Sequence, residues 1–302
     1  MRVIVSQHVS FNSLEKIIKS TELDGIFMVL GANEVKQFAR SIGADLVGVA
    51  STDRFEGAPP GHRPEDLLPG AKSVIVIAKR LPLAVVRAIP SYYYSVSVET
   101  INRELCSLSY RIATYLEDLG YLALPLDNET GRDYFEEDGK FRMLADLSLR
   151  HAAVLAGLGE IGAGAFLVTP RFGPRVRLAA VITTAALRPD PMLTKEPLKW
   201  GVICRPEACR AACIRACPAK AFPDQFPPPN PPVIDHLRCR KYRYPELDVE
   251  AWHIMAEFCR RGLSKIERDA MAAKLSSRLL GMGNRFERCA ICIKACPIGL
   301  RP

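Results

Sequence analysis

The residues of this chain that point most clearly to a chemistry are its clustered cysteines. They fall into two runs that each end in Cys-Pro, with Cys239 alone between them: Cys204-x4-Cys209-x3-Cys213-x3-Cys217-Pro218 and Cys289-x2-Cys292-x3-Cys296-Pro297. These eight thiols match the ligand count of two 4Fe–4S clusters. The spacing therefore predicts a protein that transfers single electrons.

Zinc sites and disulfides are the alternatives for these cysteines. Zinc sites favour C-x2-C pairs that are closed by further Cys or His residues after a loop. The runs here end at proline, as in the bacterial ferredoxin run C-x2-C-x2-C-x3-C-P, although the first run has wider gaps. Disulfides are disfavoured because the N-terminus has no signal-peptide pattern and a chain of 302 residues can bury a core without covalent links.

The ferredoxin pattern also predicts which cysteines share a cluster. In two-cluster ferredoxins the cysteine before proline binds the other cluster. One cluster would then be held by Cys204, Cys209, Cys213 and Cys296, and the other by Cys217, Cys239, Cys289 and Cys292. The remaining two cysteines, Cys106 and Cys259, lie in helical patterns and are predicted to be small core residues.

The order of elements predicts two domains. Residues 1–190 alternate between helical and strand patterns. We expect helices at 33–42 and 97–119, and strands at 45–50, 73–78, 121–126 and 175–186. Residues 191–302 contain the cysteine runs, a proline-rich connector at 218–232, and helical patterns at 248–261 and 264–280. We expect an α/β (α+β) domain followed by a double-cluster domain.

A glycine motif at 157–162 imitates a dinucleotide-binding fingerprint. It reads Gly-Leu-Gly-Glu-Ile-Gly and matches G-x-G-x-x-G. That fingerprint needs a strand before it, a helix after it and an acidic residue about 20 residues on. Here 151–156 reads as helix and 165–168 as strand, so the order is reversed and we expect no Rossmann site. The glycines still indicate a tight turn or a close approach to the backbone.

Composition and charge are those expected of a cytoplasmic protein. The chain has no run of 18 apolar residues that would span a membrane, and its N-terminus has neither a signal peptide nor a twin-arginine motif. The net charge of +8 is compatible with a nucleic acid or an anionic cofactor as partner. Its only dense basic patch, beside Cys239, consists of Arg238, Arg240, Lys241 and Arg243.

Several segments together resemble the epoxyqueuosine reductase and reductive dehalogenase superfamily. The clearest are 149–162 and 166–178, which read LRHAAVLAGLGEIG and FLVTPRFGPRVRL. The segments 43–50 and 68–76, and the aromatic that follows Cys239 in Cys239-Arg240-Lys241-Tyr242, resemble the family as well. The resemblance covers roughly residues 35 to 300.

This resemblance implies a nitroreductase-like domain that binds cobalamin, followed by a ferredoxin-like domain whose two 4Fe–4S clusters supply it with electrons. The cobalamin would perform the reductive chemistry, while the protein would bind and orient the cofactor and the substrate. A low-potential ferredoxin or flavodoxin would be the electron donor, and a small-molecule or tRNA-linked compound the substrate. By analogy, the residues beside the cofactor would be His151, Gly157, Leu158, Gly159, Gly162, Arg175 and Arg177.

The chain also departs from the characterised branches of that superfamily. Epoxyqueuosine reductases carry an acid shortly before the Ala-Gly-Leu-Gly stretch, whereas here the segment 125–130, Pro-Leu-Asp-Asn-Glu-Thr, lies farther upstream with a polar insertion behind it. The helical repeat tail of those enzymes and the leader of respiratory dehalogenases do not occur in this sequence. We therefore expect a short cytoplasmic relative.

Reductive cleavage requires a proton donor, and the sequence offers three candidates. Asp127 ends an apolar strand, where the alternative is a turn residue. Asp146 is the second, with an N-cap of the following helix as its alternative. Tyr93, between Tyr92 and Tyr94, is the third, with packing as its alternative. For His151 the alternative to a cofactor contact is a buried histidine with its hydrogen bonds satisfied.

Three functions are compatible with these features. The first is a cobalamin-dependent reductase. The second is an electron-transfer protein that reduces a partner's corrinoid or flavin and has no substrate of its own. The third is a nitroreductase-like flavin enzyme fused to a ferredoxin module. Retained cobalamin, a stable complex with a corrinoid protein, and co-purified flavin distinguish them in that order.

Overall fold

The fold is built around one antiparallel sheet, in a computed structural model that describes residues 30–126, 132–137, 140–196, 198–243 and 289–299. Four strands lie in the order β1-β2-β8-β3: β1 (Leu46–Ser51), β2 (Ser73–Arg80), β8 (Val176–Thr183) and β3 (Ala123–Leu126). The two central strands are apolar on both faces, since helices cover both sides of the sheet. The strands predicted from apolar runs are confirmed.

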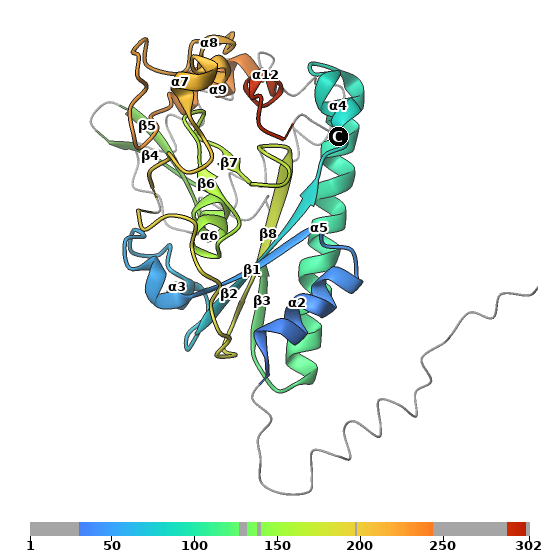
Figure 1. Cartoon of the computed structure of the whole chain (residues 1–302). Helices are drawn as coiled ribbons and strands as arrows, with labels where there is room; N and C mark the ends of the chain where they lie inside the picture. Colours follow the sequence, from blue (N-terminus) through green and yellow to red (C-terminus); the bar gives the residue numbers. More distant parts are fainter. Residues whose placement is uncertain (1–29, 127–131, 138–139, 197, 244–288, 300–302) are drawn as a thin grey trace, which may run out of the picture.

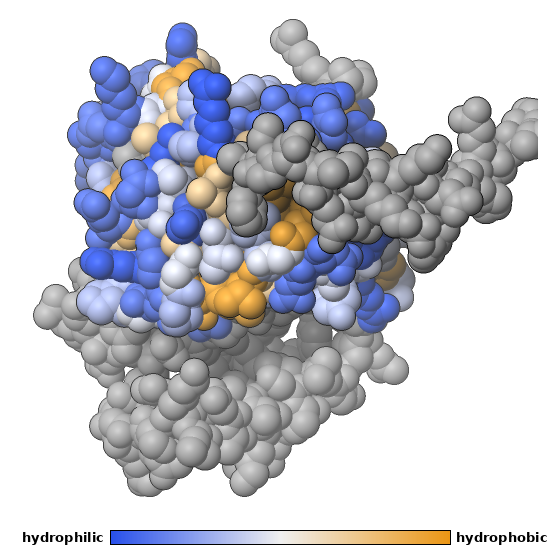
Figure 2. Space-filling view, turned by 90° about the horizontal axis from the view of Figure 1, so that it is seen from below, coloured by the Kyte–Doolittle hydropathy of each residue, from blue (hydrophilic) through white to orange (hydrophobic). Residues whose placement is uncertain are grey.

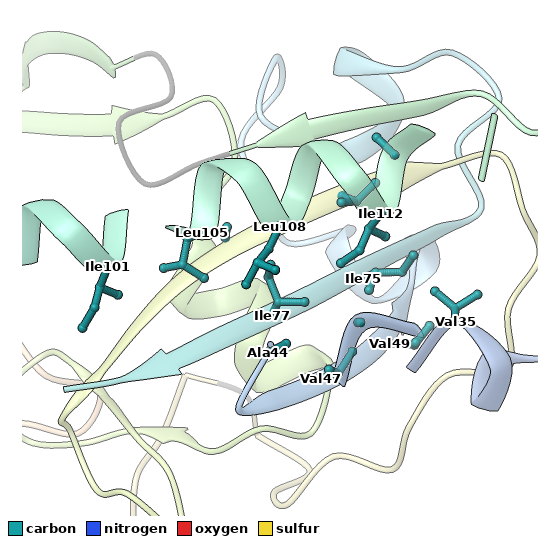
Figure 3. Close-up of a cluster of buried hydrophobic side chains, with 14 of the residues drawn as sticks. Val35, Ala44, Val47, Val49, Ile75, Ile77, Ile101, Leu105, Leu108 and Ile112 are labelled. Atoms are coloured by element: carbon teal, nitrogen blue, oxygen red, sulfur yellow. The ribbon is translucent and has the colours of Figure 1, made fainter. Parts of the chain in front are cut away.

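Helices α2 (Ala32–Ser41) and α5 (Tyr92–Asp118) cover one face of this sheet (Figure 1). In α5 the apolar residues recur at helical spacing, so they form one stripe. Figure 3 shows this stripe against β1 and β2, with Ile101, Leu105, Leu108 and Ile112 beside Ile75, Ile77, Val47 and Val49. The Ser91 side chain accepts a hydrogen bond from the Tyr94 amide, and this N-cap starts the helix earlier than predicted.

The other face of the sheet is covered by the short helix α6 (Leu149–Leu155). Small residues let this helix approach the sheet closely: a Cβ at Gly48 of β1 would overlap the Ala156 carbonyl. After α6 the chain enters the paired strands β6 (Glu160–Ile161) and β7 (Leu167–Val168). A helix therefore precedes the glycine motif and strands accompany it, which confirms that it is no Rossmann fingerprint.

The cysteine runs lie at one end of this sheet, at the top of Figure 1. Their helices are short: α7 (Pro206–Cys209), α8 (Ala212–Arg215), α9 (His236–Arg243) and α12 (Ile291–Ala295). Other small elements are η1 (Thr52–Phe55), α3 (Pro64–Leu67), α4 (Leu83–Arg87) and a hairpin of β4 (Arg132–Glu137) and β5 (Lys140–Ala145). The helices predicted at 248–261 and 264–280, and Cys259, lie outside the described residues.

The surface of the described part is mixed. Viewed from below it is mostly hydrophilic, with apolar residues in small groups between polar ones (Figure 2). None of the described helices has the length and apolar character that crossing a membrane requires. The prediction that Cys106 is a core residue was wrong, because this cysteine is exposed on α5. It follows the buried Leu105, and consecutive helical residues are turned by about 100° from each other.

Candidate metal centre

Four cysteines from the two runs line a common cavity of about 220 Å³. Cys204, Cys209 and Cys213 come from the first run, and Cys296 comes from the end of the second. The rest of the wall is mainly apolar and includes Phe166, Ile203, Ala208, Pro297 and Ile298. The structure thus brings together the four cysteines that the Cys-Pro pattern assigns to one cluster.

An unusual backbone turn between α7 and α8 points two of these cysteines to the same cavity. Arg210 and Ala211 have φ angles of 50° and 49°, both in the left-handed region. Such a conformation costs a residue with a side chain about 1 kcal/mol. The turn folds the chain back within the gap between Cys209 and Cys213, so the wider spacing of this run is accommodated there.

The other four cysteines also form a group. Burial, together with the neighbouring charges of Cys239, Cys289 and Cys217, raises the pKa of the Cys292 thiol to about 12. Cys239 lies in α9, whose first turn is held by a hydrogen bond from the Cys239 amide to the Asp235 carbonyl. These are the four cysteines that the sequence assigns to the second cluster.

The two groups are neighbours, and their electrostatics suit a cationic centre. Burial raises the pKa of Cys213 to about 12, with contributions from Cys296 and from Cys292 of the other group. Burial likewise raises the pKa of Cys204 to about 11. Thiols in such surroundings stay protonated unless a metal centre stabilises the thiolates.

The cysteine donor set fits an iron–sulfur cluster better than a single ion. The sulfurs of the first group surround a cavity, and within the described ranges no three His, Cys, Asp or Glu side chains converge on a single-ion site. Every cysteine in the described part is free of disulfide bonds. A four-iron cluster takes four thiolates, and four cysteines line this cavity.

The glycine motif lies directly against this cavity. The Ala163 amide donates to Cys204 Sγ at 3.4 Å, and a Cβ at Gly162 would stand 3.3 Å from the same sulfur. The Glu160 carboxylate is fully buried and accepts the backbone amides of Val202 and Ile203, at 2.9 and 2.8 Å, and that of Cys204. Sequence reasoning missed Glu160, although an acid within an otherwise apolar glycine-rich stretch was a signal.

The glycines predicted to approach a cofactor are packed against the chain itself. A Cβ at Gly157 would overlap the Pro191 carbonyl, and one at Gly159 would overlap the Val168 carbonyl. Leu158 is buried in the hydrophobic cluster that also contains the apolar residues of α6. Internal packing accounts for the small residues, so their contact with a cofactor stays a prediction.

Arg175 and Arg177 are also bonded within the protein. Arg175 donates from Nε to the Gly299 carbonyl and from a terminal nitrogen to the Leu81 carbonyl, each at 2.8 Å. Arg177 donates to Asn102 Oδ1 at 3.1 Å. These contacts give both arginines a structural role, and their predicted role in cofactor binding is not supported by them.

The proton-donor candidates are dispersed. Asp127 lies outside the described residues. Tyr92 and Tyr93 are 60% and 73% exposed in the first turn of α5, whereas Tyr94 is buried. The alternative assignment of Asp146 as a helix cap was wrong, because Ser148 occupies the N-cap of α6. Asp146 itself is half-buried in the turn before that cap.

His151 is held by a hydroxyl and faces a cation. Its Nδ1 lies 2.6 Å from the Ser148 hydroxyl. Burial, and then the Arg150 guanidinium, lower the pKa of His151 to about 4. The same two causes lower the pKa of His236. His151 is therefore neutral near pH 7, as a buried histidine with a satisfied Nδ1 would be.

Arg150 is hydrogen-bonded to the loop that follows the glycine motif. Its guanidinium donates to the Ala165 carbonyl, and burial lowers its pKa although the residue as a whole keeps exposed surface.

Comparisons with known proteins agree on one group of relatives, although no family model matches the chain. A tetrachloroethene reductive dehalogenase of Desulfitobacterium hafniense is 35% identical over 190 residues, which cover 62% of this chain and 29% of the relative. An epoxyqueuosine reductase of Gloeobacter violaceus is 27% identical over 252 residues, covering 72% of this chain and 68% of the relative.

Among solved structures, a reductive dehalogenase described with a mechanism for B12-dependent dehalogenation shares the fold. Its TM-score is 0.55 at 16% identity, with 87% of this chain and 38% of that chain covered. The chain spans less than half of the length of the tetrachloroethene reductive dehalogenases that it matches, between 29% and 40%.

Proposed function

Because this chain is related to the superfamily of epoxyqueuosine reductases and reductive dehalogenases, we propose that it is an iron–sulfur oxidoreductase. It passes electrons through two 4Fe–4S clusters to a bound cobalamin, for reductive chemistry on a small-molecule or tRNA-linked substrate. The observation that carries the proposal is the cavity lined by Cys204, Cys209, Cys213 and Cys296. A site that draws ligands from both Cys-Pro runs is the arrangement of a two-cluster ferredoxin.

The closeness of the two cysteine groups supports passage of electrons between clusters. Cys213 of the first group and Cys292 of the second interact electrostatically in this structure. Two clusters held by these groups would be adjacent, so an electron from a low-potential ferredoxin or flavodoxin could pass from one to the other. Such clusters exchange one electron at a time, and their potentials are tuned by the surrounding charge.

Cobalamin is supported by relationship rather than by the geometry of the residues predicted to bind it. A protein of the same fold is described with a mechanism for B12-dependent dehalogenation. When bound, such a cofactor supplies the reductive chemistry, and the protein supplies binding and orientation. The glycines and arginines predicted to bind it contact this chain's own atoms instead.

Those internal contacts favour a second candidate function. If the predicted cofactor residues serve only packing, the clusters would deliver electrons to a corrinoid or flavin on a partner protein. The chain would then have no substrate of its own. Retention of a cofactor by the isolated protein separates the two functions.

The decisive experiment is anaerobic reconstitution with iron and sulfide, followed by hydroxocobalamin and desalting. Absorbance and EPR spectra after partial reduction then report which groups remain bound. Two reduced clusters together with retained corrinoid support the reductase. Two clusters without retained corrinoid contradict the reductase and leave the electron-transfer function, which is tested next by complex formation with a corrinoid protein.

A further inference from the structure

Glu160 is a buried acid that the proposed function does not yet use. Its residue is 0% exposed, and both carboxylate oxygens accept hydrogen bonds. One oxygen takes the amide of Val202, while the other takes those of Ile203 and Cys204. Three backbone amides that donate to one side chain are an arrangement that binds a carboxylate.

Glu160 forms no ion pair with a residue in the described part of the chain. The ion pairs found between described residues involve other acids. Three backbone amides stabilise the carboxylate, and they belong to the segment that leads into the cavity. The negative charge of Glu160 is therefore fixed beside a ligand of the proposed cluster.

Two contacts hold Cys204, one from Glu160 within the glycine motif and one from Ala163, which directly follows it. Glu160 binds the Cys204 backbone amide, and the Ala163 amide donates to the Cys204 sulfur. Glu160 is itself held in place because β6 pairs with β7, with Glu160 opposite Val168. The glycine motif thus connects the sheet to Cys204, the first cysteine of the first run.

We propose that Glu160 is a positioning residue for the cluster bound by Cys204. It fixes the 202–204 segment so that Cys204 faces the cavity, and its charge lowers the reduction potential of that cluster. A buried negative charge opposes the addition of an electron nearby, and little solvent is present to screen it. This inference rests on the proposed clusters.

A merely structural role would leave the reduction potential unchanged. The potential is therefore the informative readout, measured by EPR during redox titration of the reconstituted protein. Iron and sulfide content are measured in parallel. Glu160→Gln removes the charge and nearly keeps the shape, whereas Glu160→Asp keeps the charge and loses the reach to the three amides.

Glu207 provides a matched control. It belongs to α7, close in sequence to the ligand Cys209, but it is exposed to solvent. Glu207→Gln removes the same charge where water and salt screen it. We expect Glu160→Gln to move one of the two midpoint potentials to a more positive value and to leave the other in place. Glu207→Gln should leave both unchanged.

Several results would overturn the inference. Unchanged midpoints in Glu160→Gln with full iron content would do so. If Glu160→Gln fails to fold, the inference is tested with Glu160→Asp. We expect Glu160→Asp to bind about half of the wild-type iron, the amount of one cluster of two. Full iron with wild-type midpoints in Glu160→Asp would contradict positioning. A wild-type protein that binds no iron would instead sink the proposed function itself.

Discussion

The Nε of Arg175 donates a 2.8 Å hydrogen bond to the carbonyl of Gly299, just beyond Cys296 and Pro297. The same guanidinium bonds the Leu81 carbonyl, so it joins the end of β2 to the segment that follows the last cysteine. The backbones also touch nearby, since a Cβ at Gly173 would overlap the Ile298 carbonyl. The sheet therefore holds the segment that follows Cys296, as the glycine motif and Ala163 hold Cys204.

Arg175→Met should weaken this attachment. Two carbonyls would lose a charged donor, which typically costs about 2 kcal/mol of unfolding free energy. We also expect lower iron content after reconstitution, because Cys296 would be less firmly placed. Chemical denaturation and iron analysis measure both effects. Arg171→Met is the control: Arg171 also lies over the Phe172 ring but is exposed. Equal losses in the two variants would refute the role given to Arg175.

Asp190 should contribute strongly to the stability of the sheet and the helices packed on it. Its carboxylate pairs with Lys36 Nζ at 2.7 Å and accepts the Val49 amide at 2.9 Å. Both side chains are largely buried, so Asp190→Ala leaves a cation and an amide without partners. We expect a loss of about 2 kcal/mol in denaturant unfolding at neutral pH.

The exposed pair of Glu196 and Lys199 is the comparison for Asp190. Exposed pairs of this kind contribute at most about 1 kcal/mol and often less. Glu196→Gln should therefore change the unfolding free energy by a few tenths of a kcal/mol. If the two substitutions cost the same, burial of the Asp190 pair does not have the effect assigned to it.

His151 should make the fold sensitive to acid. Its pKa is about 4 in the folded protein, against 6.5 for an ordinary histidine. Below pH 6.5 the imidazole of His151 binds a proton in the unfolded chain, whereas in the folded chain it binds one only near pH 4. Stability is thus fully present above pH 6.5 and falls as the pH drops to 4, by at most about 3 kcal/mol.

Removal of His151 itself, or of the neighbouring Arg150 guanidinium, tests this explanation of the pH dependence. His151→Gln should flatten the fall in stability between pH 6.5 and 4. Arg150→Met should raise the pKa of His151 in an NMR titration of the protein before iron is loaded, but burial should keep it below 6.5. A pKa of His151 that does not respond to Arg150→Met would show that the guanidinium does not act on it.

The sheet and its helices could be predicted because their signals are local. The buried strands β2 and β8 are continuous apolar runs, and α5 has apolar residues at helical spacing. The grouping of the cysteines followed from a pattern in which Cys-Pro ligates the other cluster. These features depend on neighbours in sequence or on a known spacing, so no tertiary contact had to be known.

The remaining features depend on contacts between distant segments. Glu160 acquires its role only because the 202–204 segment folds against the glycine motif. Arg175 is committed to Gly299, which the sequence places far away. The β4–β5 hairpin was read as a polar insertion, because charged residues dominate it and one hairpin has little apolar signal. Such partners cannot be read from periodicity.

Iron content of paired cysteine variants tests the central claim most directly. The reconstituted wild-type chain should bind about eight irons, as two 4Fe–4S clusters require, and Cys213→Ser about four. Adding Cys296→Ser to Cys213→Ser should leave about four, because both cysteines line one cavity. Adding Cys292→Ser instead should remove nearly all iron, whereas Cys106→Ser should remove none. Equal iron in the two double variants would contradict the assigned ligand sets.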